Sequence, residues 1–98
     1  MAIPKTARSA KGSLDNRANK VRVEFLKIDS EIGLTFSGIA LGAMDEDKKK
    51  RTTRTARDAY DAIMRLRNYA RLTDAETKML DANLHRLKDE LQQLGETF

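Results

Sequence analysis

The residues with the clearest capacity to bind a ligand lie in "DEDKKKRTTRTAR", residues 45–57, where three acids are followed by six bases. On a helical wheel at about 100° per residue, Lys50, Arg54, Arg57 and Arg65 fall on the side opposite the apolar positions of the same segment. Such a ridge could contact the phosphates of a nucleic acid or of another polyanion. The same bases could instead pair with acidic side chains elsewhere in the chain.

The distribution of charge bears on this choice. The chain has a formal net charge of +4. Residues 1–20 account for all of it, because the rest of the chain is neutral. Within that neutral part the net charge is −4 over residues 21–47, +7 over 48–71 and −3 over 72–98. A basic middle segment therefore lies between two acidic ones, an arrangement that favours pairing within the fold.

We accordingly expect bases on the flanks of the middle segment to approach acids of its neighbours. The bases are Arg51 and Arg67, and the acids are Glu24, Glu31, Asp81 and Glu90. The outer ridge stays available to an anionic partner, but no aromatic residues alternate with it to stack on bases. Nucleic-acid or polyanion binding, through the basic N-terminal tail and the ridge, is therefore the alternative hypothesis rather than the leading one.

The single histidine, His85, has Asp81 and Asp89 four residues before and after it, so that the three side chains share one face of a helix. They could contact a metal ion. A solvated row of ion pairs is the favoured interpretation, because metal ligands need a supporting shell of other groups. The chain has no Cys, and no nucleophile is spaced to pair with a base. We predict no enzyme activity, no cofactor and no metal.

An all-α fold is predicted to position these residues. With 98 residues, the chain has the length of one small domain. Residues 1–14 lack an apolar period, and we predict a disordered basic tail there. Residues 15–98 are predicted to form an elongated antiparallel three-helix bundle, with helices at about 16–43, 46–71 and 74–94.

Local signals define the predicted helix ends. Asp45 is a suitable N-cap for the middle helix. Thr73, with Glu76 three residues later, forms a capping-box pattern at the start of the third helix. Gly95 is placed to stop that helix at its C-terminal end. Within the third helix, leucines recur in steps of four and three at Leu80, Leu84, Leu87, Leu91 and Leu94, which predicts one buried face.

The first helix has apolar residues on more than one side. One stripe advances in steps of four and three, and we predict that it faces the core: Val21, Phe25, Ile28, Ile32, Thr35 and Ile39. Other apolar residues lie off this stripe: Val23, Leu26, Leu34, Phe36 and Leu41. A three-helix monomer would leave some of them uncovered, so we predict a homodimer or a groove for a partner helix. Its candidate residues are Leu34, Phe36, Gly38 and Leu41.

Three glycines interrupt the first helix. Gly38 and Gly42 are four residues apart and share one face. They could form a hinge or a groove for a partner, and the favoured interpretation is a close crossing with a neighbouring helix of the same bundle.

Residues 33–66 resemble a single tetratricopeptide-type helical hairpin. Leu34, Gly38 and Leu41 resemble the large–small–large pattern of its first helix, and Ala56 and Tyr60 resemble the small and aromatic positions of its second helix. The chain departs from that family in its longer connection, in its lack of the terminal Pro and in its lack of a second copy of the unit. The resemblance implies an interaction scaffold and transfers no binding residues.

The leading prediction is a non-catalytic helical protein–protein interaction or scaffold module. Its partner is expected to be another protein or, more simply, a second copy of the chain. No apolar run reaches the length of a membrane span, so that we expect a cytoplasmic protein without a membrane partner.

Overall fold

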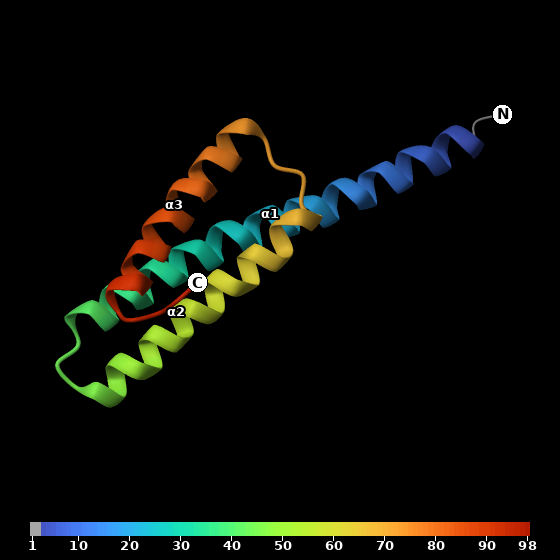
Figure 1. Cartoon of the computed structure of the whole chain (residues 1–98). Coiled ribbons are helices and arrows are strands. Elements are labelled where there is room, and N and C mark those ends of the chain that lie inside the picture. Colours follow the sequence, from blue (N-terminus) through green and yellow to red (C-terminus); the bar gives the residue numbers. More distant parts are fainter. Residues whose placement is uncertain (1–2) are drawn as a thin grey trace.

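Three helices account for most of the computed structural model, which describes the backbone of residues 3–98 and the side chains of residues 15–98 (Figure 1). They are α1 (Ile3–Gly42), α2 (Glu46–Leu66) and α3 (Asp74–Gln93), with a short 3-10 turn, η1 (Arg67–Tyr69), after α2. Successive helices run antiparallel, so that α3 runs in the same direction as α1. The molecule measures 68 × 24 × 18 Å. The predicted elongated antiparallel three-helix bundle is confirmed.

The first helix is longer than the other two, and its N-terminal part projects beyond them (Figure 1). The helix begins at Ile3, whereas we predicted a start near residue 16. The basic tail that we predicted over residues 1–14 lies outside the residues whose side chains the structure describes. Asn19 is the first described residue of α1 with a side-chain hydrogen bond to another part of the chain, and the packed part of the bundle begins there.

The start of α2 agrees with its predicted cap. The Asp45 carboxylate accepts a hydrogen bond from the backbone N–H of Lys48, with 3.2 Å between the nitrogen and the oxygen. Glu46 and Asp47 occupy the first turn, where the helix dipole favours negative charge. This cap lets α2 begin directly after the short connection from α1.

The end of α2 comes earlier than predicted, at Leu66 rather than near Arg71. After η1 the backbone is extended at Ala70. The Asn19 side chain then donates to the carbonyl of Arg71 at 3.1 Å and accepts from its N–H at 2.6 Å. A side-chain amide on α1 thus satisfies both backbone groups of a residue that has left the helix, which stabilises the turn towards α3.

Both ends of α3 form the capping motifs that the sequence predicts. Thr73 accepts a hydrogen bond from the Glu76 N–H, and Glu76 accepts one from the Thr73 N–H. At the other end, Gly95 has φ of 95°, and its N–H and that of Glu96 bond to the carbonyls of Gln92 and Leu91. This left-handed Schellman arrangement favours glycine. The residues that follow turn back towards α2 (Figure 1).

The core consists of two clusters along the bundle. Four leucines of α3 are buried as predicted, whereas Leu94 is partly exposed and packs against the cluster that contains Leu87 and Leu91. The first cluster contains Leu26, Ile63, Leu80 and Leu84, and the second contains Ala56, Leu87 and Leu91. Tyr60 of α2 packs against both clusters and so connects them.

The side of α1 that faces this core is the one that our prediction of the core stripe missed. Its buried positions are Val23, Leu26, Ser30, Gly33, Ser37 and Ala40. Small residues dominate this face, and they let α2 and α3 approach α1 closely. The prediction that the other stripe faces the core was therefore wrong. The side chains of that stripe are larger, and they would hold α2 and α3 further from α1.

The closest approach is at Gly33, and not at Gly38 and Gly42 as we predicted. A Cβ atom at Gly33 would lie 2.7 Å from Cδ2 of Leu87 and 3.4 Å from Cβ of Ala59. At Gly38 and Gly42 a Cβ would meet nothing within 4 Å. Of these three glycines, Gly33 is therefore the one at which an added side chain would crowd its neighbours, because both other helices meet α1 there.

Two polar contacts align α1 with α3. The Asn83 amide donates to Ser30 Oγ at 3.2 Å, and the Ser37 hydroxyl lies 2.8 Å from Oε1 of Glu90, to which it donates. Each pair is separated from the other by the same seven residues on both helices. A slip of α3 along α1 would disrupt both contacts together. The loss would be costly, because buried polar groups need hydrogen-bond partners. These contacts therefore specify the register of the two parallel helices.

Candidate interaction surface

The stripe that we predicted to be buried is instead a continuous apolar surface on α1. We call it the α1 seam and define it as Val21, Phe25, Ile28, Ile32, Thr35 and Ile39. The exposed fractions of its five large apolar residues are 68% for Val21, 45% for Phe25, 52% for Ile28, 40% for Ile32 and 39% for Ile39. No described helix of the chain covers these side chains. Apolar residues exposed in a continuous row commonly mark an interface.

The spacing of the α1 seam is that of a coiled coil. Its residues advance in steps of four, three, four, three and four, which is the a/d pattern of a heptad repeat. Phe25, Ile32 and Ile39 take the a positions, and Val21 and Ile28 take d positions together with a polar Thr35. The residues buried inside the bundle fall on the b and f positions of the same repeat, on the other side of the helix. Helix α1 therefore has one face that packs in the bundle and, on its other side, an exposed apolar face with heptad spacing.

Charged residues border the α1 seam on both edges. The helical repeat places Arg22 and Asp29 along one edge, at e positions, and Glu24 and Glu31 along the other, at g positions. Partial burial raises the pKa of the Asp29 carboxyl above its ordinary value. Among the ion pairs of the described residues, none involves any of these four side chains. Their charges are therefore not compensated by ion pairs within the described residues.

A small apolar hollow extends the α1 seam onto α2. It has a volume of about 190 Å³ and is lined by Val21, Arg22, Phe25 and Leu66. Leu66 is 40% exposed and is the last residue of α2. The exposed apolar surface therefore broadens at this end of the bundle.

The four residues that we proposed from the sequence as an interface do not share one surface. Leu34 and Phe36 are partly buried against the cluster of Ala56, Leu87 and Leu91. Gly38 and Leu41 are exposed, on the same helix. Spacing alone could not have identified the α1 seam, because the buried stripe of α1 also advances in alternating steps of three and four. The two stripes differ in the size of their side chains, which are smaller in the buried one.

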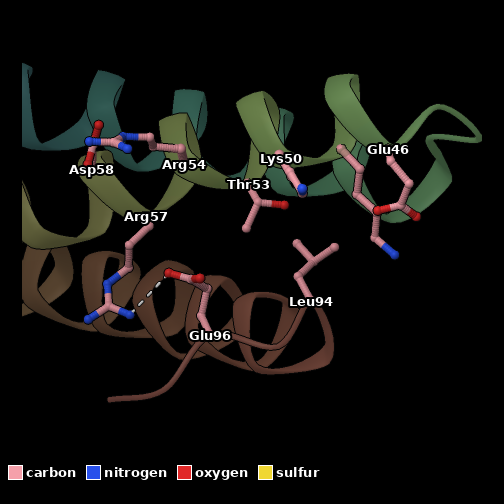
Figure 2. Close-up of a pocket in the computed structure, with 9 residues that line it drawn as sticks. Glu46, Lys50, Thr53, Arg54, Arg57, Asp58, Leu94 and Glu96 are labelled. Carbon is pink, nitrogen blue, oxygen red and sulfur yellow. Dashed lines mark hydrogen bonds and ion pairs between the residues drawn. The ribbon is translucent and has the colours of Figure 1, made fainter.

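The basic ridge contributes to a second, polar hollow between α2 and the end of α3 (Figure 2). The hollow has a volume of about 550 Å³. Three of the predicted ridge residues line it, namely Lys50, Arg54 and Arg57, while Arg65 does not. Its other lining residues include the acids Glu46, Asp58 and Glu96 as well as Lys49, Thr53 and Leu94. The bases are therefore mixed with acids rather than concentrated.

Arg57 is not the solvent-facing residue that the helical wheel predicts. Its guanidinium lies 3.1 Å from Asp61, 3.4 Å from Glu96 and 2.7 Å from the carbonyl oxygen of Thr97. It also lies over the ring of Phe98, with 4.1 Å from Cζ to the ring centroid. Arg57 thus fastens the C-terminal segment onto α2, which leaves its charge largely compensated within the chain.

Pairing of the basic segment with acidic neighbours is found at one of the predicted places. Arg67 bonds to Asp81 of α3 at 2.8 Å. Glu90 instead pairs with Arg86 on its own helix at 3.2 Å. Within the described residues, no ion pair joins Arg51 to α1. Among the described residues, charge pairing between helical elements is therefore limited to the contact of η1 with α3.

The histidine and its flanking acids do not converge. His85 is exposed and lies 3.5 Å from Asp89, whereas Asp81 is turned towards Arg67. In the part of the chain that the structure describes, no three His, Cys, Asp or Glu residues are grouped so that they could hold a metal ion.

Comparisons with protein-family models, with curated proteins and with solved structures found no match. The resemblance of residues 33–66 to a tetratricopeptide-type hairpin therefore stays a prediction. None of the described helices has the length and apolar character needed to cross a membrane.

Proposed function

We propose that the protein is a non-catalytic helical interaction module that self-associates through the α1 seam. The observation that carries this proposal is the row of five large apolar side chains, between 39% and 68% exposed, in heptad spacing on a helix already anchored by its other face. A heptad seam is matched best by another helix, because the two can supercoil and interlock along their whole length.

A second copy of the chain is the partner that this surface fits. In a two-fold dimer, one contact covers the α1 seams of both copies. Leu66 of α2 borders the seam at the small hollow, and the large apolar side chains of the seam nevertheless stay between 39% and 68% exposed. The two copies together would form a six-helix assembly with the paired α1 helices at its centre.

The expected affinity is modest. Burial of a fully exposed large apolar side chain stabilises by about 1.5–3 kcal/mol, and the seam residues are roughly half exposed. Covering them gains about 1 kcal/mol each, or roughly 10 kcal/mol for two copies. The loss of translational and rotational freedom costs about 4–15 kcal/mol. The net gain is at most about 6 kcal/mol, which corresponds to a dissociation constant of roughly 40 µM, so we expect a dimer that forms only at tens of micromolar protein or above.

Sedimentation equilibrium over a wide range of protein concentration tests the proposal. The wild type should change from monomer to dimer as its concentration rises, and Ile28→Gln combined with Ile32→Gln should stay monomeric. A matched control replaces two similarly exposed residues on the other helices, Met64→Gln and Met79→Gln, and should dimerise like the wild type. Circular dichroism confirms that each variant is folded. A wild type that stays monomeric throughout, or a seam variant that still dimerises, would refute the proposal.

Polyanion binding through the basic ridge has less support. Arg57 is engaged with the C-terminal segment, and Glu46 and Asp58 share the hollow with Lys50 and Arg54. Acids among the bases reduce the attraction that the hollow can exert on phosphate.

A further inference from the structure

We infer that the two copies pair with their α1 helices antiparallel, an inference that rests on the proposed function. It follows from the charges that border the α1 seam and from the order of the seam residues. Both features distinguish between the two orientations that a two-fold dimer allows.

A parallel pair would bring like charges together. In a parallel coiled coil with two-fold symmetry, each g position of one helix faces the following e position of the other. Arg17 would then face Arg22, and Glu24 would face Asp29, and symmetry would repeat each contact. Glu31 would face the uncharged Phe36. None of these contacts is attractive, and like charges at such positions select against a pairing.

An antiparallel pair allows a register in which the large seam residues face one another. When a positions pack against d positions, Phe25 of one copy lies opposite Ile28 of the other, and Ile32 lies opposite Val21. Both contacts occur twice. This register covers the middle of the seam with its largest side chains. It places the polar Thr35 near the margin, opposite Ala18, and Ile39 beyond it, opposite position 14.

The same register pairs opposite charges on one edge. In an antiparallel coiled coil, e positions face e positions and g positions face g positions. Arg22 then faces Asp29 of the other copy, twice. On the opposite edge Glu24 faces Glu31, also twice. The antiparallel dimer therefore has one attractive and one repulsive edge, whereas the parallel dimer has like charges on both.

Two single charge reversals distinguish the orientations by the sign of their effects. Glu31→Lys should tighten the antiparallel dimer, because the introduced lysine faces Glu24, and it should leave a parallel dimer nearly unchanged. Arg22→Glu should weaken the antiparallel dimer, because the introduced glutamate faces Asp29, but it should tighten a parallel dimer by facing Arg17. With two symmetry-related contacts, each effect on the dimer dissociation constant is expected to be roughly three- to tenfold at low salt.

The experiment measures the dissociation constants of the wild type and both variants by sedimentation equilibrium at low salt. Arg65→Glu and Asp58→Lys make the same changes of charge on the outer side of α2, and they should leave the constant unchanged. Tightening by Glu31→Lys together with weakening by Arg22→Glu supports the antiparallel pair. Tightening by Arg22→Glu, or no effect from either seam variant, overturns it while the proposed function stands. A wild type that never dimerises overturns both.

Discussion

Replacing Gly33 by alanine tests the close packing of α1 against the other two helices. In a helix interior, alanine is favoured over glycine by about 1 kcal/mol. Here the new Cβ would lie 2.7 Å from Cδ2 of Leu87, well inside the contact optimum of roughly 3.5–4.0 Å between carbon atoms. Leu87 is completely buried, so that it has little room to move. Overpacking of this kind costs about 1–3 kcal/mol, and we expect a net loss of about 0–2 kcal/mol.

Gly38→Ala is the matched control. It makes the same change in the same helix, at a position where a Cβ meets nothing within 4 Å, and it should stabilise the protein by up to about 1 kcal/mol. Both variants share the gain in helix propensity, so it cancels when their free energies of unfolding are subtracted. The remaining difference is the overpacking cost of about 1–3 kcal/mol.

Urea unfolding at low protein concentration measures this difference without a contribution from self-association. The free energies of unfolding of Gly33→Ala and Gly38→Ala are compared with that of the wild type at equal slope of the transition. A Gly33→Ala variant as stable as Gly38→Ala would refute the reasoning, because it would show that Leu87 adjusts without cost or that α1 is further from α3 than the structure places it.

Three further changes probe other contacts. Ser37→Ala should cost about 1–2 kcal/mol in urea unfolding, because the mostly buried Glu90 carboxylate loses the hydrogen bond from Ser37 and keeps the one from Arg86; an unchanged midpoint would contradict this. The hydrogen bond from the backbone N–H of Thr73 lowers the pKa of Glu76. The ionised Glu76 therefore stabilises the fold fully when the pH is above the ordinary pKa of a glutamate, and this stabilisation is lost as the pH falls through the lowered pKa. Glu76→Gln should therefore lose less stability than the wild type on acidification, and identical pH profiles would refute this assignment. Arg57→Gln should cost about 1–2 kcal/mol, since it releases an ion pair, a carbonyl and an aromatic contact; a loss near zero would favour the exposed ridge.

The helix ends and the core face of α3 could be predicted from the sequence because their causes are local. A cap needs only a suitable side chain and a backbone N–H three residues away, as at Asp45 and at Thr73. The leucines of α3 form the single large apolar stripe of that helix, and so their burial requires no knowledge of the partner helices.

The orientation of α1 could not be predicted in the same way, because two stripes of the helix have heptad spacing. The stripe with the larger side chains fits the usual expectation for a core. The stripe around Gly33 is buried instead, because Ala59 and Leu87 approach it closely and because Ser30 and Ser37 find polar partners on α3. These determinants lie on other helices, and a pattern read along α1 alone does not contain them.

The role of Arg57 was missed for a related reason. Its position on the outer side of α2 predicts exposure, but besides Asp61 on its own helix its partners belong to the C-terminal segment, about 40 residues later in the chain. That segment reaches α2 only because Gly95 turns the chain after α3. The sequence shows a ridge of basic residues, but in the fold the charge of Arg57 is largely compensated by its neighbours.

The measurement that tests the central claim most directly is a comparison of amide NMR spectra of the wild type at low and high protein concentration. If α1 pairs with a second copy, the signals that shift as concentration rises should come from the α1 seam and its bordering charges, between Ala18 and Ile39, while those of the outer side of α2 stay in place. Spectra that do not change with concentration, or shifts confined to the basic ridge of α2, would contradict self-association through the α1 seam.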